Sequence, residues 1–216
     1  MDSNTVVMLA VVAIVVYSIS LHELAHAYAA TWCGDPTPGR NGRLTWNPIV
    51  QLHPFYSIAL PIISYFLMGW PFGFAFTPID PSRFRRPLRD RALVGISGPL
   101  VNFLLMALLV GLLWIPGLAT PPSYDFPGSY NFPVFFYAAY FNLLLGVFNL
   151  LPIPGLDGYD VIRPALPLSL RRPLDNLRRM GLVPMLLIFF LGPRLLSAFW
   201  YDVERLFLKL VPGGGW

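Results

Sequence analysis

The chain has 216 residues, of which 56% are hydrophobic and only 12% are charged. A soluble domain carries about twice that share of charge, so this composition excludes an ordinary soluble protein and indicates an integral membrane protein. The net charge of +4 comes almost entirely from arginines in short loops beside apolar segments, which favours a role in membrane topology over nucleic-acid binding. The single cysteine, Cys33, excludes an internal disulfide. No linker or repeat divides the chain, which predicts one domain over residues 1–216.

The first apolar segment, residues 5–30, contains the motif His22-Glu23-Leu24-Ala25-His26. On a helix, His22 and His26 lie on one face, where both imidazoles can bind one Zn²⁺. Glu23 lies beside them, where its carboxylate can accept a proton from an attacking water. A chance match is the alternative, but three ionisable groups in a membrane segment are costly unless something binds them. The segment therefore predicts a zinc site for hydrolysis at membrane depth, on a retained transmembrane helix.

Five apolar segments approach or exceed the roughly 20 residues that cross the hydrocarbon core of a bilayer. They cover residues 5–30, 55–76, 92–115, 134–151 and 182–200. We therefore expect an all-α polytopic membrane protein with about four to six transmembrane helices. Arginine-rich loops follow the first and fourth segments and precede the third, whereas residues 116–133 contain no lysine or arginine. The positive-inside rule places the arginine-rich loops in the cytoplasm and residues 116–133 outside.

The second segment conflicts with this topology, because the arginines on both of its sides favour the cytoplasm. Several prolines and glycines also make an uninterrupted helix unfavourable there. We predict that residues 52–80 enter the membrane and return on the same side, with extended backbone near residues 72–77. Such backbone is tolerated only where protein or water shields it from lipid.

Two histidines leave a catalytic zinc one ligand short of its usual three, and Asp157 is the predicted third ligand. His22 lies ~25 Å along the first helix and the fourth segment covers ~27 Å, so both residues reach a similar depth near the cytoplasmic face. Prolines end the fourth segment before Asp157, and Gly158 permits a sharp turn after it. An Asx turn or helix cap at Asp157 is the structural alternative. Asp160 is the competing ligand, although it lies further into the polar loop.

Other polar residues in or near the apolar segments leave two interpretations open. Asn102 and Asn149 either hydrogen-bond the substrate backbone or an oxyanion, or hold two helices together. His53 is interpreted as a structural residue at the membrane interface. Gly98, within Ser97-Gly98-Pro99, is interpreted as a site of close helix packing.

These residues together resemble the site-2 protease family of intramembrane zinc metalloproteases, in its short form without appended domains. The resemblance covers most of the chain and rests on the following motifs: His22–His26 with Tyr28-Ala29-Ala30, Gly34-Asp35-Pro36, Gly42-Arg43-Leu44-Thr45 with Asn47-Pro48, Arg89-Asp90, Ser97-Gly98-Pro99-Leu100-Val101-Asn102, Phe148-Asn149-Leu150-Leu151-Pro152 and Leu156-Asp157-Gly158. The chain departs from the family pattern at Gly155, where relatives often have proline, at residues 76–81 and at His53.

By this resemblance, His22, His26 and Asp157 hold one Zn²⁺ per chain, Glu23 activates water, and Asn149 positions the peptide or stabilises the developing oxyanion. The resemblance further implies a multi-pass protein of the cell membrane with its active site near the cytoplasmic side. Its expected partners are the lipid bilayer and membrane-protein substrates with a transmembrane segment, and the sequence carries no signal for an oligomeric state. A non-catalytic metal-binding scaffold or transporter-like protein is the alternative. The intact Glu23 argues against it, because a structural zinc site needs no base.

Overall fold

The computed structural model describes residues 3–59, 63, 66, 75–119, 131–181 and 197–213. Within these residues, three helices are long and apolar enough to cross a membrane: α1 (Ser3–Trp32), α5 (Pro87–Leu113) and α6 (Asn131–Asn149). No strand occurs in the described part of the chain. The predicted class, an all-α polytopic membrane protein, is confirmed.

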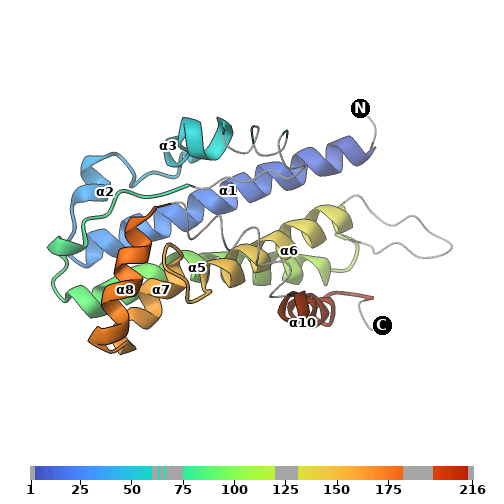
Figure 1. Ribbon diagram of the computed structural model, residues 1–216. Helices are drawn as coiled ribbons and strands as arrows, with labels where there is room; N and C mark the ends of the chain where they lie inside the picture. Colours follow the sequence, from blue (N-terminus) through green and yellow to red (C-terminus); the bar gives the residue numbers. More distant parts are fainter. Residues whose placement is uncertain are drawn as a thin grey trace.

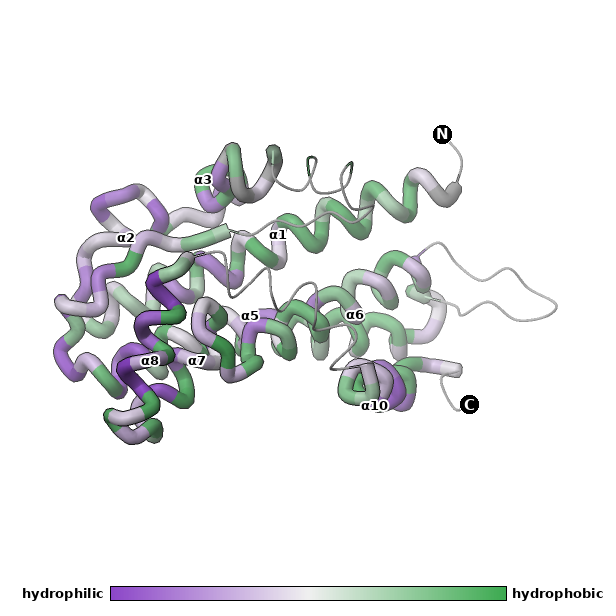
Figure 2. Tube along the Cα trace, in the orientation of Figure 1, coloured by the Kyte–Doolittle hydropathy of each residue, from purple (hydrophilic) through white to green (hydrophobic). Residues whose placement is uncertain are grey.

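The three long helices form the body of the protein, with α5 packed along both α1 and α6 (Figure 1). Hydrophobic residues dominate along these helices, and hydrophilic residues gather at the end where α2, α7 and α8 lie (Figure 2). The shorter elements are α2 (Thr37–Arg40), α3 (Pro48–Gln51), the π-helix η1 (Pro54–Ala59), the 3-10 turns η2 (Pro81–Arg83) and η3 (Arg163–Ala165), α7 (Asp157–Ile162), α8 (Leu168–Arg179) and α10 (Ser197–Leu208).

Helices α1 and α6 begin and end within a few residues of the predicted segments, but α5 begins earlier than expected. Its first residue is Pro87 rather than residue 92, because the carboxylate of Asp90 accepts a hydrogen bond from the backbone N–H of Arg86 at 2.7 Å. Proline suits a first helical position, where its missing N–H costs nothing. Hydrogen bonding at the helix start thus extends α5 beyond its apolar sequence.

Two predicted segments lie mostly outside the described residues. Of residues 182–200, only the first residues of α10 are described. In the predicted re-entrant segment, residues 60–62, 64–65 and 67–74 are not described, whereas residues 75–80 have neither helix nor strand. The return of this segment on the same side of the membrane stays a prediction.

Helix α7, which begins with Asp157, is held against α5 and α8. Asp175 on α8 accepts two hydrogen bonds from Arg163, at 3.0 and 2.7 Å, and one from the buried Tyr159 hydroxyl at 2.8 Å. The hydrogen bonds from Arg163 lower the pKa of Asp175 to about 2, so the Asp175 carboxylate stays ionised at neutral pH and the ion pair is kept. This bidentate pair fixes the short element that presents Asp157 to α1.

Candidate metal centre

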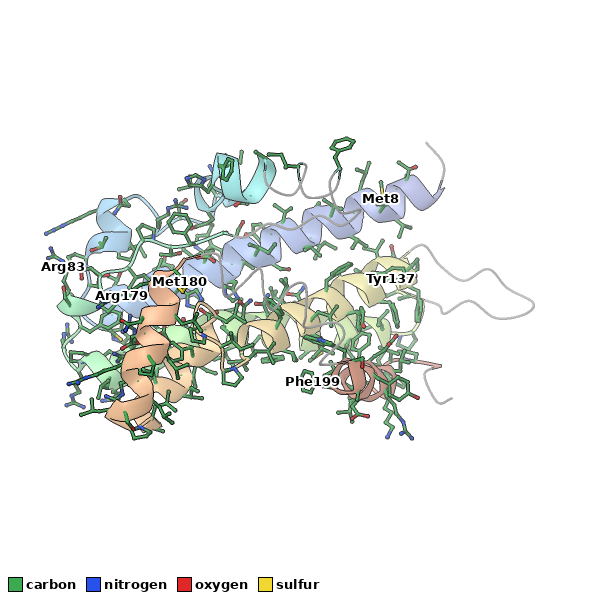
Figure 3. All side chains as sticks on the ribbon, viewed as in Figure 1. Met8, Arg83, Tyr137, Arg179, Met180 and Phe199 are labelled. Carbon is green, nitrogen blue, oxygen red and sulfur yellow. The ribbon has the colours of Figure 1, made fainter. Side chains whose placement is uncertain are left out.

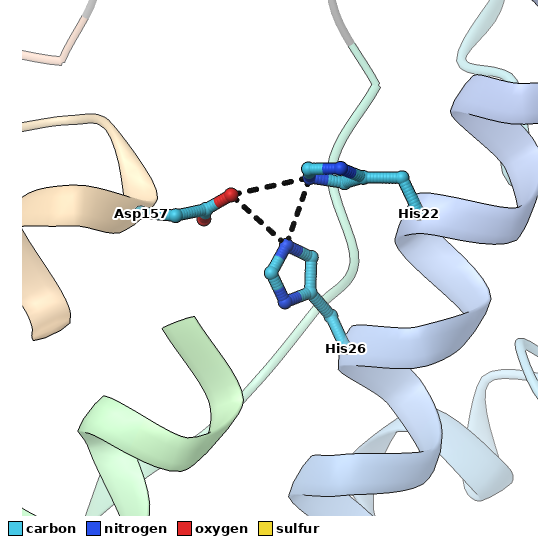
Figure 4. Close-up of side chains that lie close together, drawn as sticks. All are labelled: His22, His26 and Asp157. Carbon is cyan, nitrogen blue, oxygen red and sulfur yellow. Dashed lines mark hydrogen bonds and ion pairs between the residues drawn. The ribbon is translucent and has the colours of Figure 1, made fainter. Parts of the chain in front are cut away.

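Two histidines of α1 and the first residue of α7 bring three metal-binding groups to one point (Figure 4). His22 Nε2 and His26 Nε2 lie 3.0 Å apart, and Asp157 Oδ2 lies 3.1 Å from the first and 3.2 Å from the second. Both histidines are buried, and Asp157 is partly buried. The structure thus brings together the three residues expected to be ligands. That they hold a metal ion stays a prediction.

Hydrogen bonds on the other side of each imidazole decide which ring nitrogen carries the proton. His26 Nδ1 lies 2.8 Å from the carbonyl oxygen of Val94, which can only accept, so Nδ1 carries the hydrogen. His22 Nδ1 donates in the same way to Asn102 Oδ1 at 2.6 Å. Each neutral ring therefore presents an Nε2 lone pair toward Asp157 Oδ2. That oxygen is buried and has no hydrogen-bond partner in the described part of the chain.

Two nitrogen lone pairs and a carboxylate oxygen at this spacing repel one another unless a cation binds them. Two imidazoles and one carboxylate are a typical set of three protein ligands for a hydrolytic zinc ion, whereas Mg²⁺ and Ca²⁺ favour oxygen ligands alone. Hydrogen bonds from Nδ1 to a fixed acceptor are also typical of histidines that bind zinc. The donor set of this site therefore fits zinc.

Asn102 lies behind His22 in a buried chain of polar groups that crosses three helices. Asn142 Nδ2 donates to the carbonyl oxygen of Ala138 at 2.9 Å and to Ser18 Oγ at 3.0 Å, which fixes the orientation of its amide. Asn142 Oδ1 then accepts from Asn102 Nδ2 at 3.1 Å, and Asn102 Oδ1 is left to accept from His22. Both asparagines are fully buried. Asn102 on α5 thus contacts α1 and α6, which agrees with the interpretation that it holds helices together.

Replacing Asn102 with leucine is expected to weaken zinc binding about 10- to 100-fold, because His22 loses the acceptor that orients its ring. The affinity can be measured on the purified protein by competition with a chromophoric chelator. Asn176→Leu, at an exposed position of α8, is the matched control and should leave the affinity unchanged. Equal affinities for the two variants would contradict a role of Asn102 in orienting the ligand.

Glu23 is buried beside His22 and is held by Thr77, which the sequence did not single out as a site residue. Thr77 Oγ1 lies 2.7 Å from Glu23 Oε2 and 3.0 Å from the Glu23 carbonyl oxygen. A hydroxyl donates only one hydrogen, and a bond to the ionised carboxylate is the stronger choice. The two residues are 54 positions apart, and residues 75–80 have no regular structure, so no spacing rule could have paired them.

We expect Thr77→Val to slow peptide hydrolysis about tenfold, because a hydrogen bond to a charged group contributes about 1.5–3 kcal/mol to holding the carboxylate in place. Thr77→Ser keeps the donor and should retain most of the wild-type rate. Initial cleavage rates, compared at equal zinc content, measure both effects. A Val variant as active as the Ser variant would show that the hydroxyl does not position Glu23.

A cavity of about 330 Å³ opens beside these groups, and its wall includes Glu23, Thr77 and the three predicted metal ligands. Asn149, at the end of α6, also lies on this wall, and its Nδ2 donates to the carbonyl oxygen of Leu145 at 2.9 Å. Its predicted role toward the substrate stays a prediction. The cavity gives a peptide room to approach the carboxylate of Glu23.

Two further candidates from the sequence lie apart from the metal-binding group. Asp160 pairs with Arg178 and with Arg91, whose Nε lies 2.9 Å from Asp160 Oδ1 without the alignment of a hydrogen bond. Its carboxylate is therefore engaged elsewhere, which leaves Asp157 as the third ligand candidate. The ring of His53 lies 5.7 Å from the ring of Phe76, measured between centroids, and its structural role stays a prediction.

A glycine turn presents Asp157 to the histidines. Gly155 has a φ of +108°, a conformation that proline cannot adopt because its ring holds φ near −65°. The turn of this chain therefore differs from the proline turn expected from the family pattern. Helix α7 still begins at Asp157, so glycine at this position does not separate the carboxylate from the imidazoles.

Comparison with known proteins adds a second line of observation. The sequence model of peptidase family M50 matches residues 126–192. YwhC of Bacillus subtilis, named as a zinc metalloprotease, is 32% identical over 177 residues, which cover 81% of this chain and 77% of YwhC. Rip2 of Mycobacterium tuberculosis H37Rv, named likewise, is 34% identical over 190 residues, which cover 88% of this chain and 70% of Rip2. The regulator of sigma-W protease RasP of B. subtilis is 35% identical over 75 residues, or 35% of this chain and 18% of RasP. No solved structure matches the chain.

An apolar helix with two histidines and a buried glutamate, and an aspartate beside the histidines, is the arrangement expected of a membrane-embedded metallopeptidase. The relatives agree with that class, since those that align over most of the chain are named zinc metalloproteases. This chain belongs to peptidase family M50, the site-2 protease family. The resemblance found in the sequence is confirmed, and the protein is a metalloendopeptidase.

Proposed function

We propose that this protein is a zinc-dependent intramembrane endopeptidase, which hydrolyses peptide bonds in the transmembrane segments of other membrane proteins. The observation that carries the proposal is the location of the site on an apolar helix. His22, Glu23 and His26 lie on α1, a helix long and apolar enough to cross a membrane, and His22 is ~25 Å along it. A hydrolytic centre at that depth faces peptide bonds that enter the bilayer.

In the proposed reaction, one Zn²⁺ is held by His22, His26 and Asp157. When bound, zinc supplies Lewis-acid polarisation of the scissile carbonyl and lowers the pKa of water toward about 7. Glu23 accepts one proton from the attacking water while the water oxygen bonds to the carbonyl carbon. As the carbon–nitrogen bond breaks, Glu23 passes this proton to the leaving nitrogen. Thr77 holds the carboxylate in line during both transfers.

The substrate peptide must unwind before hydrolysis, because helical hydrogen bonds shield its peptide bonds. Residues 75–77 have no helix or strand and lie on the wall of the cavity. They are suited to pair with an extended substrate by strand addition. Asn149, on the same wall, is suited to donate to the substrate backbone or to the oxygen that gains negative charge.

We further propose that this centre lies near the cytoplasmic side of a multi-pass protein in the cell membrane. Arg83 and Arg179 lie at the end of the bundle opposite Met8 (Figure 3), and the positive-inside rule assigns that end to the cytoplasm. His22 and Asp157 lie toward this end of the apolar span. Water therefore has a short route to the cavity.

The alternative is a non-catalytic metal-binding scaffold. A structural zinc ion normally has four protein ligands and no base beside it, whereas the described residues supply three ligands and a buried Glu23. The hydrogen bond from Thr77 to Glu23 also favours catalysis, since a scaffold has no use for an oriented carboxylate.

The experiment uses the purified full chain in liposomes with a panel of single-span membrane proteins and signal-peptide remnants as probes. We expect products cut within the apolar segment when analysed by mass spectrometry. Chelation of zinc should abolish these products, and added Zn²⁺ should restore them, since bound metal supplies the Lewis acid. Cuts confined to soluble regions would refute the intramembrane activity, and cuts unaffected by chelation would refute the dependence on zinc.

A further inference from the structure

A second cavity lies between the end of α1 and the beginning of α5. Its volume is about 320 Å³, and no described residue lines both this cavity and the cavity of the metal centre. The residues that line it are Trp32, Cys33, Arg85, Arg86, Arg89, Asp90 and Leu93. The proposed peptidase reaction uses none of them.

The three arginines of this cavity differ from others near the same end of the bundle. Arg83, Arg91, Arg163 and Arg178 each form an ion pair with an aspartate. In contrast, Arg85, Arg86 and Arg89 form no ion pair within the described residues, and all three are exposed.

Among the described residues, Asp90 is the one carboxylate on the cavity wall. It is buried, and its carboxylate accepts a hydrogen bond from the backbone N–H of Arg86. It therefore caps α5 rather than neutralising a guanidinium. Three arginines and this carboxylate line the cavity, so its described lining carries a net positive charge. The amino-terminal end of the 27-residue α5 adds a favourable dipole for an anion.

The other side of the cavity is apolar and lies where a membrane-spanning helix ends. Trp32 is the last residue of α1 and is 85% exposed, and Leu93 on α5 is 44% exposed. Tryptophan is enriched where the hydrocarbon of a bilayer meets its headgroups, because the ring is apolar with one polar edge. Cationic and apolar walls thus meet at one cavity, at the level of the membrane interface.

We propose that this cavity binds the phosphate of an anionic phospholipid headgroup, with Arg85, Arg86 and Arg89 as its ligands. Guanidinium groups donate paired hydrogen bonds to phosphate oxygens, and Trp32 and Leu93 contact the glycerol and upper acyl chain. A lipid matches both walls, whereas a soluble phosphate matches only the cationic one. The bound lipid would join the ends of α1 and α5, the helices that carry and orient the predicted metal ligands.

The test measures lipid retained by the purified full chain in native mass spectrometry, with phosphatidylglycerol and phosphatidylcholine as probes. We expect phosphatidylglycerol retention to weaken at least about tenfold in the triple variant Arg85→Gln/Arg86→Gln/Arg89→Gln. Each arginine near a membrane surface raises the affinity for anionic lipid roughly fivefold. Retention of phosphatidylcholine should not change. Arg172→Gln/Arg179→Gln/Arg205→Gln removes the same charge from exposed positions outside the cavity and should retain phosphatidylglycerol.

Equal loss of phosphatidylglycerol in both triple variants would overturn the proposal in favour of a general surface charge effect. Displacement of the lipid by inorganic phosphate alone would overturn it in favour of a soluble anion site. The triple lysine variant, which keeps the charge, should retain more lipid than the glutamine variant and shows that the chain is folded. Because retention is measured without a peptide substrate, its outcome is independent of the proposed peptidase reaction.

Discussion

Replacing Gly98 with alanine is expected to abolish zinc binding and, with it, peptide hydrolysis. A Cβ atom at position 98 of α5 would lie 2.4 Å from His26 Nε2 and 2.6 Å from His22 Nε2, the two atoms predicted to hold the metal. Real Cβ contacts are essentially never shorter than 3.0 Å, so the two imidazoles or helix α5 must shift, and the spacing of the predicted ligands is expected to change. The zinc content per chain, measured by elemental analysis after purification, should fall at least about tenfold, since a displaced first ligand costs more than the 10–100-fold typical of a lost outer-shell contact.

Gly111→Ala is the matched control, because it makes the same substitution on the same helix. At this position no described atom outside the neighbouring turns of α5 lies within 4 Å of the new methyl group. Alanine favours a helix over glycine by about 1 kcal/mol, so both variants gain helix propensity and neither should unfold for lack of it. The control should bind zinc as the wild type does. Full zinc occupancy in Gly98→Ala would refute the assignment of His22 and His26 as ligands.

The parts of the site that follow from local spacing could be predicted from the sequence. His22 and His26 share a helical face because they are four residues apart, and Asp157 follows an apolar segment of matching length. Whether these two elements can meet then depends on the depth that each residue reaches in the membrane. The sequence also predicted close packing at Gly98. It did not predict that the atoms packed against this glycine belong to the imidazoles of His22 and His26.

The remaining contacts depend on how the helices are rotated, which an apolar sequence does not encode. A helix that is hydrophobic on all sides has no polar face to mark its orientation. The polar character of Asn102 marked it as important, but its partners His22 and Asn142 lie on other helices. Thr77 could not be predicted for a related reason, because residues 75–80 lack any periodicity that would place them against α1.

Glu23→Gln and Asp157→Asn should separate the base from the metal ligand, because each replaces one carboxylate oxygen with an amide nitrogen and removes one charge. The Gln variant should keep its zinc, since Glu23 is no ligand and Thr77 can still donate to the amide oxygen. Its cleavage rate should fall about 10²–10⁴-fold, the contribution of a positioned general base. The Asn variant should lose most of its zinc, because a neutral amide is a poor replacement for the carboxylate that binds this ion.

Both quantities, zinc per chain and initial cleavage rate, are measured on the same preparations. The base assignment would be wrong if Glu23→Gln cut at the wild-type rate, and the ligand assignment would be wrong if Asp157→Asn kept its zinc. Excess Zn²⁺ adds a further distinction, since it should restore part of the activity of the Asn variant by mass action and none of that of the Gln variant. The two variants thus assign one carboxylate to holding the ion and the other to moving the proton, although both lie within the same cavity.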